Sequence, residues 1–238
     1  MNILLTNDDG YNAKGIILLR KLLSKYGNVV ICAPRGPMSA KSISITIDKP
    51  FHVIEEEKGV FSIDGTPADC VRFAHRGFNI DFDLVVSGCN HGWNISFDTL
   101  YSGTVGAALQ ACNYEMKSIA VSCQMNFDIV EKYFDEVMKF ILDHDLLSDK
   151  YLLNVNFPLG EEIKGIALGH QFDRKDEDFV APYEDGYQSY RKIPEDYSSD
   201  PESDCYQVRN GIVSIVPLKK VLYQESLYNE LKKRIKAK

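Results

Sequence analysis

Two adjacent carboxylates near the start of the chain are the first residues whose types and spacing suggest chemistry. Asp8 and Asp9 follow the apolar run Ile3-Leu4-Leu5 and precede Gly10. The run predicts a short strand buried on both faces, as in a parallel sheet covered by helices. Neighbouring carboxylates repel each other, and a bound cation or solvent relieves this repulsion. The pair is therefore either a candidate cation site or an ordinary polar turn in which Gly10 takes a left-handed conformation.

Three further polar residues stand at the ends of predicted elements. Ser39 lies in the loop after the apolar strand 28–33, and Asn90 follows the apolar strand 83–87. Ser102 is a suitable N-cap for a helix that begins with small residues. Ligands bind at the carboxyl edge of the strands in open α/β folds. We therefore expect these three residues to lie at the same sheet edge as the acidic pair.

The side chains at this predicted edge offer only oxygen ligands. Such ligands suit a hard cation such as Mg²⁺, Mn²⁺ or Ca²⁺, whereas zinc sites use His or Cys at short spacing. The positive end of the helix that begins near Ser102 suits an anion. The residues therefore predict metal-assisted phosphoryl transfer to water, with no side-chain nucleophile. Asp8 and Asp9 are the predicted catalytic residues, because either could orient the attacking water or accept its proton.

Motifs of several other protein classes do not occur in the sequence. The chain has no GxSxG, no GxxxxGK[ST] loop and no GxGxxG after the first strand. A receiver-like switch needs a phosphorylatable aspartate after a middle strand, but the strand 83–87 leads into Gly88-Cys89-Asn90. A non-hydrolytic Mg²⁺-binding switch or a nucleotide-binding module without turnover stays the alternative. His91 could serve as a general acid or as a simple binding contact.

Composition limits the partners and the compartment. The chain has 238 residues, of which 45% are hydrophobic and 26% charged, as in ordinary globular proteins. Its net charge of −7 argues against binding to nucleic-acid polymers or anionic membranes. No apolar run approaches the roughly 20 residues of a membrane span, and no signal peptide is recognised. The six cysteines form no CxxC pair and predict buried, reduced thiols in a cytoplasmic protein.

The predicted strands and helices alternate along most of the chain. Strands are predicted at 3–5, 28–33, 42–47, 51–54, 60–63, 83–87, 118–123, 151–157 and 212–216, and helices at 13–26, 66–76, from about 101, 128–144 and 219–238. The alternation predicts an α/β fold, a doubly wound Rossmann-like parallel sheet with an extended arm and a C-terminal helix. We expect a catalytic core at 1–160 and an extension for oligomerisation at 161–238. The acidic segment 170–205 is predicted as a flexible loop or an arm that folds against a partner subunit.

Several ordered motifs also occur over about the first 125 residues. They are Ile3 to Gly10 (ILLTNDDG), Ala33-Pro34 followed by Ser39 and Ser42 to Thr46 (SISIT), Gly65 to Val71 (GTPADCV), Asp83 to Gly88 (DLVVSG) with Asn90, Gly92 and Asn94, and Asp98 with Tyr101 to Ala108 (YSGTVGAA). Asn154 to Pro158 (NVNFP) continues the series. Together these motifs resemble those of the SurE family, the survival-protein nucleotidases. By motif position, the resemblance implies cation ligands at Asp8, Asp9, Ser39 and Asn90, and phosphate contacts at Asn94, Ser102, Gly103 and Thr104.

The resemblance implies a metal-dependent phosphatase that hydrolyses nucleoside 5′-monophosphates, with 3′-nucleotidase or polyphosphate activity in some members. It also implies one divalent cation per subunit, Mg²⁺ or Mn²⁺, and a homodimer or homotetramer, often with exchanged C-terminal segments. Ala40 and Ser96 stand where the family usually has glycine, and Cys89 stands where isoleucine is usual. Trp93, at a variable position, could stack on a base or pack locally.

Overall fold

A nine-stranded, mostly parallel sheet forms the centre of the computed structural model, which describes residues 1–192, 199–219 and 225–236. Its strands are β1 (Asn2–Thr6), β2 (Asn28–Pro34), β3 (Val53–Glu57), β4 (Val60–Ile63), β5 (Leu84–His91), β6 (Ser118–Cys123), β7 (Tyr151–Phe157), β8 (Gly165–Leu168) and β11 (Ile212–Lys219). The order is β3-β4-β2-β1-β5-β6-β7-β11-β8. Only the β3–β4 and β7–β11 pairs of this sheet are antiparallel. The predicted α/β class is confirmed.

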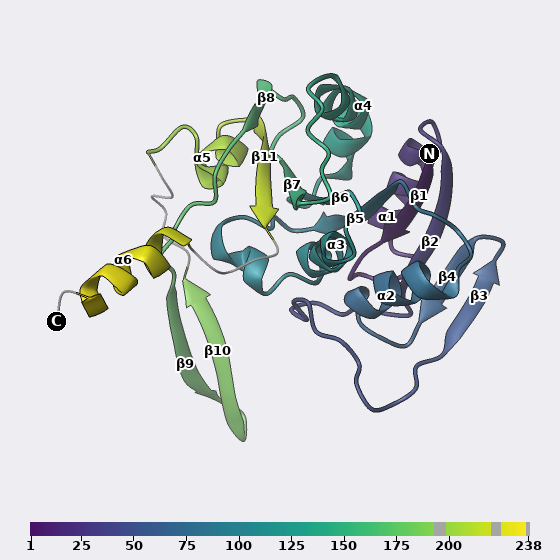
Figure 1. Ribbon diagram of the computed structural model, residues 1–238, viewed down its shortest axis with the longest axis horizontal. Helices are drawn as coiled ribbons and strands as arrows, with labels where there is room; N and C mark the ends of the chain where they lie inside the picture. Colours follow the sequence, from purple (N-terminus) through teal and green to yellow (C-terminus); the bar gives the residue numbers. More distant parts are fainter. Residues whose placement is uncertain (193–198, 220–224, 237–238) are drawn as a thin grey trace.

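Helices cover both faces of the sheet (Figure 1). The covering helices are α1 (Lys14–Leu23), α2 (Pro67–Gly77), α3 (Gly103–Asn113) and α4 (Phe127–Asp143), with the short α5 (Asp204–Arg209) against β11. The last helix, α6 (Glu225–Lys236), lies apart from the sheet (Figure 1). On one face, α1 and α4 bury side chains such as Leu19 and Phe134. On the other face, α2 and α3 bury Val71 and Ala107. The doubly wound arrangement is thus confirmed. Among the described helices, none has both the length and the hydropathy that a membrane span requires.

The chain changes direction across the sheet between β1 and β5. From β1 it continues to β2 and β4 on one side, and β5, β6 and β7 follow on the other. β1 and β5 are parallel neighbours, with Ile3 opposite Leu84 and Thr6 opposite Ser87. Ligand sites of open α/β sheets lie at such a switch point, outside the carboxyl ends of the strands. The segments after Thr6 and Ser87 are therefore the expected place for a site.

Two predicted helix starts are confirmed in detail. Thr66 and Asp69 form a capping box: the Asp69 backbone N–H donates to Thr66 Oγ1 at 3.1 Å, and the Thr66 N–H donates to Asp69 Oδ2 at 3.0 Å. At the start of α3, the Val105 N–H donates to Ser102 Oγ at 3.0 Å. Ser102 is therefore the N-cap, and α3 begins at Gly103.

The predicted strand at residues 42–47 is wrong. This segment has no strand partner among the described residues, because its polar groups bond to the start of α2. The Thr46 backbone N–H donates to both carboxylate oxygens of Asp69, at 3.0 and 3.1 Å. The Thr66 hydroxyl donates to the carbonyl oxygen of Ser44 at 2.6 Å. Side-chain bonds to the backbone have thus replaced a strand ladder despite the alternating pattern.

The acidic segment after β8 contains a hairpin that projects from the body of the molecule (Figure 1). Its antiparallel strands are β9 (Glu177–Tyr183) and β10 (Gly186–Lys192). This hairpin is the predicted extended arm, and α6 is the predicted C-terminal helix. Parts of the predicted arm and of the predicted helix lie outside the described residues, namely 193–198, 220–224 and 237–238. β8 was not predicted from the sequence, and the division at residue 160 stays a prediction.

Candidate active site

The turn after β1 holds the two carboxylates at the edge of the sheet. Asn7 closes this turn from both sides of Gly10: its Oδ1 accepts from the Gly10 N–H at 3.1 Å, and its Nδ2 donates to the Gly10 carbonyl at 2.9 Å. Gly10 has a φ of +114°, a conformation that strains any residue with a Cβ. The turn therefore fixes the direction in which Asp8 and Asp9 leave β1.

Asp8 lies directly against the first turn of α3. Asp8 is only 5% exposed, and its Oδ1 accepts a hydrogen bond from the Thr104 hydroxyl. A Cβ at Gly103 would lie 2.8 Å from the Cβ of Asp8, which is closer than atoms can approach. Glycine at position 103 is thus what lets the helix start reach the acidic turn.

Burial changes the acidity of both carboxylates. It raises the pKa of Asp8 to about 6; the hydrogen bond from Thr104 opposes this rise, and the charge of Asp9 adds to it. Burial also raises the pKa of Asp9, although the charge and the backbone amide of His91 lower it. In the described part of the chain, no Lys or Arg forms an ion pair with either carboxylate. The negative charge of the pair is therefore not neutralised by a Lys or Arg partner in the described residues.

Ser39 and Asn90 each lie next to a residue that contacts the acidic turn, Met38 and His91 respectively. The Met38 backbone N–H donates to the Asp8 carbonyl at 2.7 Å, so the loop that carries Ser39 lies against the acidic turn. The Ser39 side chain is exposed and makes no hydrogen bond to another described residue. Asn90 lies in β5, next to β1, and its Nδ2 donates to the Gly92 carbonyl at 2.9 Å. This bond leaves the side-chain oxygen of Asn90 as the available ligand atom.

The donor chemistry of this edge fits a hard divalent cation. Two carboxylates, one hydroxyl and one amide oxygen are the ligand types that Mg²⁺ and Mn²⁺ prefer. The residues that the structure describes contain no group of three or more His, Cys, Asp or Glu side chains that could hold a metal. A cation at this edge would therefore need the neutral oxygens of Ser39 and Asn90 as well as the carboxylates.

Asn94 is buried against the later parts of β6 and β7. Its backbone N–H donates to Asn156 Oδ1 at 2.9 Å, and its carbonyl accepts from Asn154 Nδ2 at 2.7 Å. One hydrogen of its side-chain amide is donated to Ser122 Oγ, at 2.8 Å. The second is available to a ligand. Asn154 and Asn156 were not predicted as positioning residues, although two asparagines inside a buried apolar strand must find partners.

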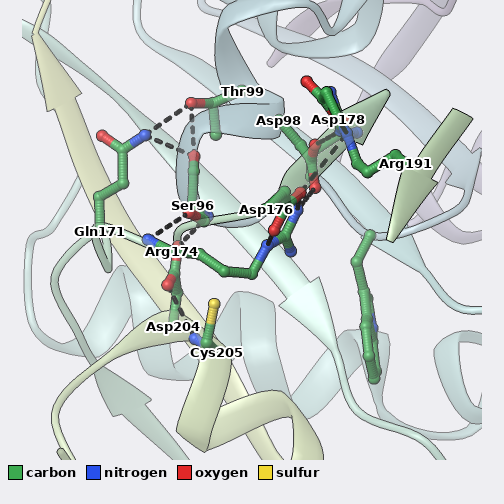
Figure 2. A network of polar contacts seen from close by, with 12 residues as sticks. Ser96, Asp98, Thr99, Gln171, Arg174, Asp176, Asp178, Arg191, Asp204 and Cys205 are labelled. Carbon is green, nitrogen blue, oxygen red and sulfur yellow. Dashed lines mark hydrogen bonds and ion pairs between the residues drawn. The ribbon is translucent and has the colours of Figure 1, made fainter. Parts of the chain in front are cut away.

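The segment between Asn94 and Ser102 forms a short 3₁₀ helix, η1 (Ser96–Leu100). Side chains from the later part of the chain contact it, as Figure 2 shows: Gln171, Arg174, Arg191 and Asp204. Ser96 and Ala40 have φ values of 53° and 57°, in the left-handed region that favours glycine. This explains why their positions suit the glycines that the resemblance implied.

Two aromatic residues near the site have clear surroundings. Trp93 is half-buried, donates from its Nε1 to the Phe157 carbonyl at 2.7 Å and packs against Ile95. It therefore packs locally, which was one of the two roles considered from the sequence. His91 is exposed, with its ring centroid 5.7 Å from that of Phe127. The two roles considered for it, general acid and binding contact, both stay predictions.

Comparison with known proteins decides the family. Residues 3–178 match the family model described as "Survival protein SurE". The chain belongs to the SurE family. Two SurE relatives named 5′-nucleotidase SurE, from Clostridium botulinum (strain 657 / Type Ba4) and Clostridium tetani, are 40% and 37% identical to it. The first alignment covers 92% of each chain, and the second covers 97% of this chain and 98% of the relative. The resemblance drawn from the motifs is confirmed.

The fold agrees with a solved SurE structure along nearly the whole chain. The crystal structure of the SurE protein from Aquifex aeolicus superposes with a TM-score of 0.84 at 32% identity. The match covers 98% of this chain and 99% of the other. The SurE family assignment therefore includes the hairpin-bearing extension as well as the sheet edge that carries Asp8 and Asp9.

Proposed function

We propose that the chain is a metal-dependent 5′-nucleotidase, which hydrolyses nucleoside 5′-monophosphates to nucleoside and phosphate. The observation that carries this proposal is the contact between Asp8 and the first turn of α3. A carboxylate pair with no Lys or Arg ion partner among the described residues lies beside a helix start whose amides suit an anion. A cation and a phosphate could therefore bind side by side. The names of the Clostridium relatives support a nucleoside monophosphate as the substrate.

Four residues would hold the cation in this proposal: Asp8, Asp9, Ser39 and Asn90. One Mg²⁺ or Mn²⁺ per subunit is proposed. When bound, such a cation neutralises the carboxylates and withdraws electron density from phosphate oxygens. The ligand set gives the cation only oxygen atoms. Because the pKa of Asp8 is raised to about 6, a proton competes with the cation below that pH, and binding should be strong only above it.

The chain's own residues then bind the phosphate and direct the water. The backbone amides of Gly103 and Thr104, the hydroxyl of Ser102 and the side-chain amide of Asn94 donate to phosphate oxygens. Asp9 is less buried than Asp8 and is not held by Thr104. We therefore assign to Asp9 the role of orienting the attacking water and accepting its proton. The phosphorus–oxygen bond to the nucleoside breaks as the water oxygen bonds to phosphorus.

A phosphate-release assay tests the substrate class. The purified chain is incubated with nucleoside 5′-monophosphates, the matching 3′-monophosphates and polyphosphate, each with Mg²⁺, with Mn²⁺ or with EDTA. Release of phosphate from at least one nucleoside 5′-monophosphate in the presence of a cation is the expected result. Binding of the nucleotides without phosphate release would instead support a nucleotide-binding module or a switch.

Assembly and location complete the proposal. We propose a homodimer or homotetramer in the cytoplasm, with residues 161–238 providing the assembly surfaces. The apolar residues Leu227, Leu231 and Ile235 repeat every four positions along α6 and are all exposed, as expected for a face that another subunit covers. All six cysteines are buried and none of them forms a disulfide in the described structure, which suits a reducing compartment. Light scattering of the purified chain measures the assembly directly.

A further inference from the structure

The carboxylate of Asp98, in η1, lies between two arginines from the extension (Figure 2). Arg174 donates from Nη2 to Asp98 Oδ2 at 2.8 Å, and Arg191 donates from Nη1 to Asp98 Oδ1 at 2.5 Å. Each arginine thus holds a different oxygen of the same carboxylate. The side chains of Arg174 and Asp98 are 2% and 22% exposed, so that solvent screens these contacts less than it screens surface ion pairs. The carboxylate can hardly turn without losing one of its partners.

Arg191 is itself held in place by the hairpin. It lies opposite Asp178 in the β9–β10 pair, and its Nε donates to Asp178 Oδ1 at 3.1 Å. Its guanidinium carbon lies 5.4 Å from the ring centroid of Phe97 and 5.7 Å from that of Tyr101, both within the range of cation–π contacts. The base of the hairpin therefore presents a guanidinium with a fixed orientation to η1.

The backbone of Asp98 continues the connection towards the proposed phosphate site. Its carbonyl oxygen accepts hydrogen bonds from the Tyr101 N–H at 3.0 Å and from the Ser102 N–H at 3.1 Å. Ser102 is the N-cap of α3, and the next two residues contact Asp8. A turn of Asp98 would thus move the amides at the start of α3.

We infer that Arg191 is a positioning residue for phosphate binding: through Asp98, it holds the start of α3 in place. The inference rests on the proposed function, because it places the phosphate at Ser102, Gly103 and Thr104. It extends that function to the hairpin: β10 is part of the machinery of the site as well as a candidate assembly arm. The residue itself touches neither phosphate nor cation, and it acts only through Asp98.

Arg191→Ala tests the inference, and Lys192→Ala is its matched control. Lys192 is the next residue of β10 and also forms an ion pair on the hairpin, with Glu177 at 3.1 Å, but both side chains are exposed and neither contacts η1. Arg191→Ala should weaken the binding of inorganic phosphate about tenfold, measured by calorimetry with Mn²⁺ present. A misplacement of about 1 Å can cost up to about a hundredfold, and a smaller shift of the helix start should cost less. KM for the nucleotide should rise by a similar factor, with a smaller change in kcat.

Two further variants separate positioning from general support of the fold. Arg191→Lys keeps the charge but cannot bridge Asp98 and Asp178 with a planar group, and its phosphate affinity should fall between those of the wild type and Arg191→Ala. Asp98→Asn combined with Arg191→Ala should weaken phosphate binding no further than the stronger single change, because both act on one contact.

The outcomes separate this inference from the proposed function. If the unsubstituted chain hydrolyses nucleotides and Arg191→Ala binds phosphate as tightly as Lys192→Ala, the inference is overturned and the proposed function stands. A lower Tm with unchanged phosphate affinity and KM also overturns it, since the contact would then only support the fold. If the unsubstituted chain neither binds phosphate nor releases it from nucleotides, the proposed function fails, and the inference fails with it.

Discussion

The hydroxyl of Thr104 donates a hydrogen bond to Oδ1 of Asp8. This bond joins the first turn of α3 to the acidic turn after β1. The two residues are 96 positions apart in the sequence, and both are buried. The bond favours the ionised form of Asp8 in a place where burial disfavours it. One hydroxyl thus links the proposed phosphate site to the proposed cation site.

Replacing Thr104 by Val should show this link as a change in pH dependence. Valine has nearly the same shape but cannot donate, so that the pKa of Asp8 rises further. A hydrogen bond to a charged group contributes about 1.5–3 kcal/mol, and the acid midpoint of Mn²⁺ binding should therefore move up by about one to two pH units. Binding is measured by calorimetry between pH 5 and pH 8. Thr104→Ser keeps the hydroxyl and should bind with the wild-type midpoint. Equal midpoints for the Val and Ser variants would contradict the proposed link.

The raised pKa of Asp8 predicts a stability change in the cation-free protein. Because the folded-state pKa of about 6 lies above the ordinary value of 3.8, the folded chain holds this proton more tightly than the unfolded chain. The resulting stability is present below pH 3.8 and is lost as the pH rises through about 6. Asp8→Asn, which stays neutral, should therefore increase the free energy of unfolding by up to about 3 kcal/mol at pH 7.5.

Urea denaturation in EDTA measures this difference between Asp8→Asn and the wild type. Below pH 3.8 the two proteins should have nearly the same stability, because Asp8 is then protonated in both the folded and the unfolded state. With a cation present, the variant should be inactive. Asp8 would then be a residue that serves activity at a cost in stability. An Asn variant that is less stable than the wild type at pH 7.5 would show that burial of the Asp8 charge is not costly.

Gly103→Ala tests the close approach of α3 to the acidic turn. The added methyl group would lie 2.8 Å from the Asp8 Cβ, and the helix start or the carboxylate must move. Overpacking of this kind costs about 1–3 kcal/mol of stability, and a displaced site should lose at least about tenfold in kcat/KM. Gly165→Ala is the control, because a Cβ there meets nothing within 4 Å. Comparable activity in the two variants would show that the contact has no functional part.

Local signals in the sequence predicted the elements that depend on neighbouring residues. Thr66, Pro67 and Asp69 form the start of α2 as their types indicate, because capping is satisfied within one turn. The same reasoning was wrong for residues 42–47. Alternation there resembles a strand, but Asp69 offers acceptors to Thr46 from a segment 23 residues away, which the pattern does not show. The two-residue turn between β9 and β10 is Glu184-Asp185, with Glu184 at a φ of 51°. Two acidic residues are not the usual Asn-Gly or Asp-Gly hairpin signal, so the sequence did not predict this turn.

Some residues of the candidate site could also be predicted from local sequence signals, and others could not. Asp8, Asp9, Ser39 and Asn90 could be placed near one sheet edge because each follows a recognisable apolar strand, and the carboxyl ends of such strands lie at one edge. Their role as cation ligands stays a prediction. The residues that position the site could not be predicted from the sequence. Asp98 and Arg191 are 93 positions apart, and no spacing rule connects a residue of a 3₁₀ helix with one of a distant hairpin. Asn156 reaches Asn94 across 62 positions for the same reason.

Removal and return of the cation test the central claim most directly. Phosphate release from a nucleoside 5′-monophosphate is measured for the wild type and for Asp9→Asn, first with EDTA and then with Mn²⁺ or Mg²⁺ in excess. The wild type should be inactive in EDTA and recover when the cation returns, whereas Asp9→Asn should bind the cation more weakly and keep little activity at saturation. Full activity of the wild type in EDTA, or of Asp9→Asn with the cation, would contradict the account.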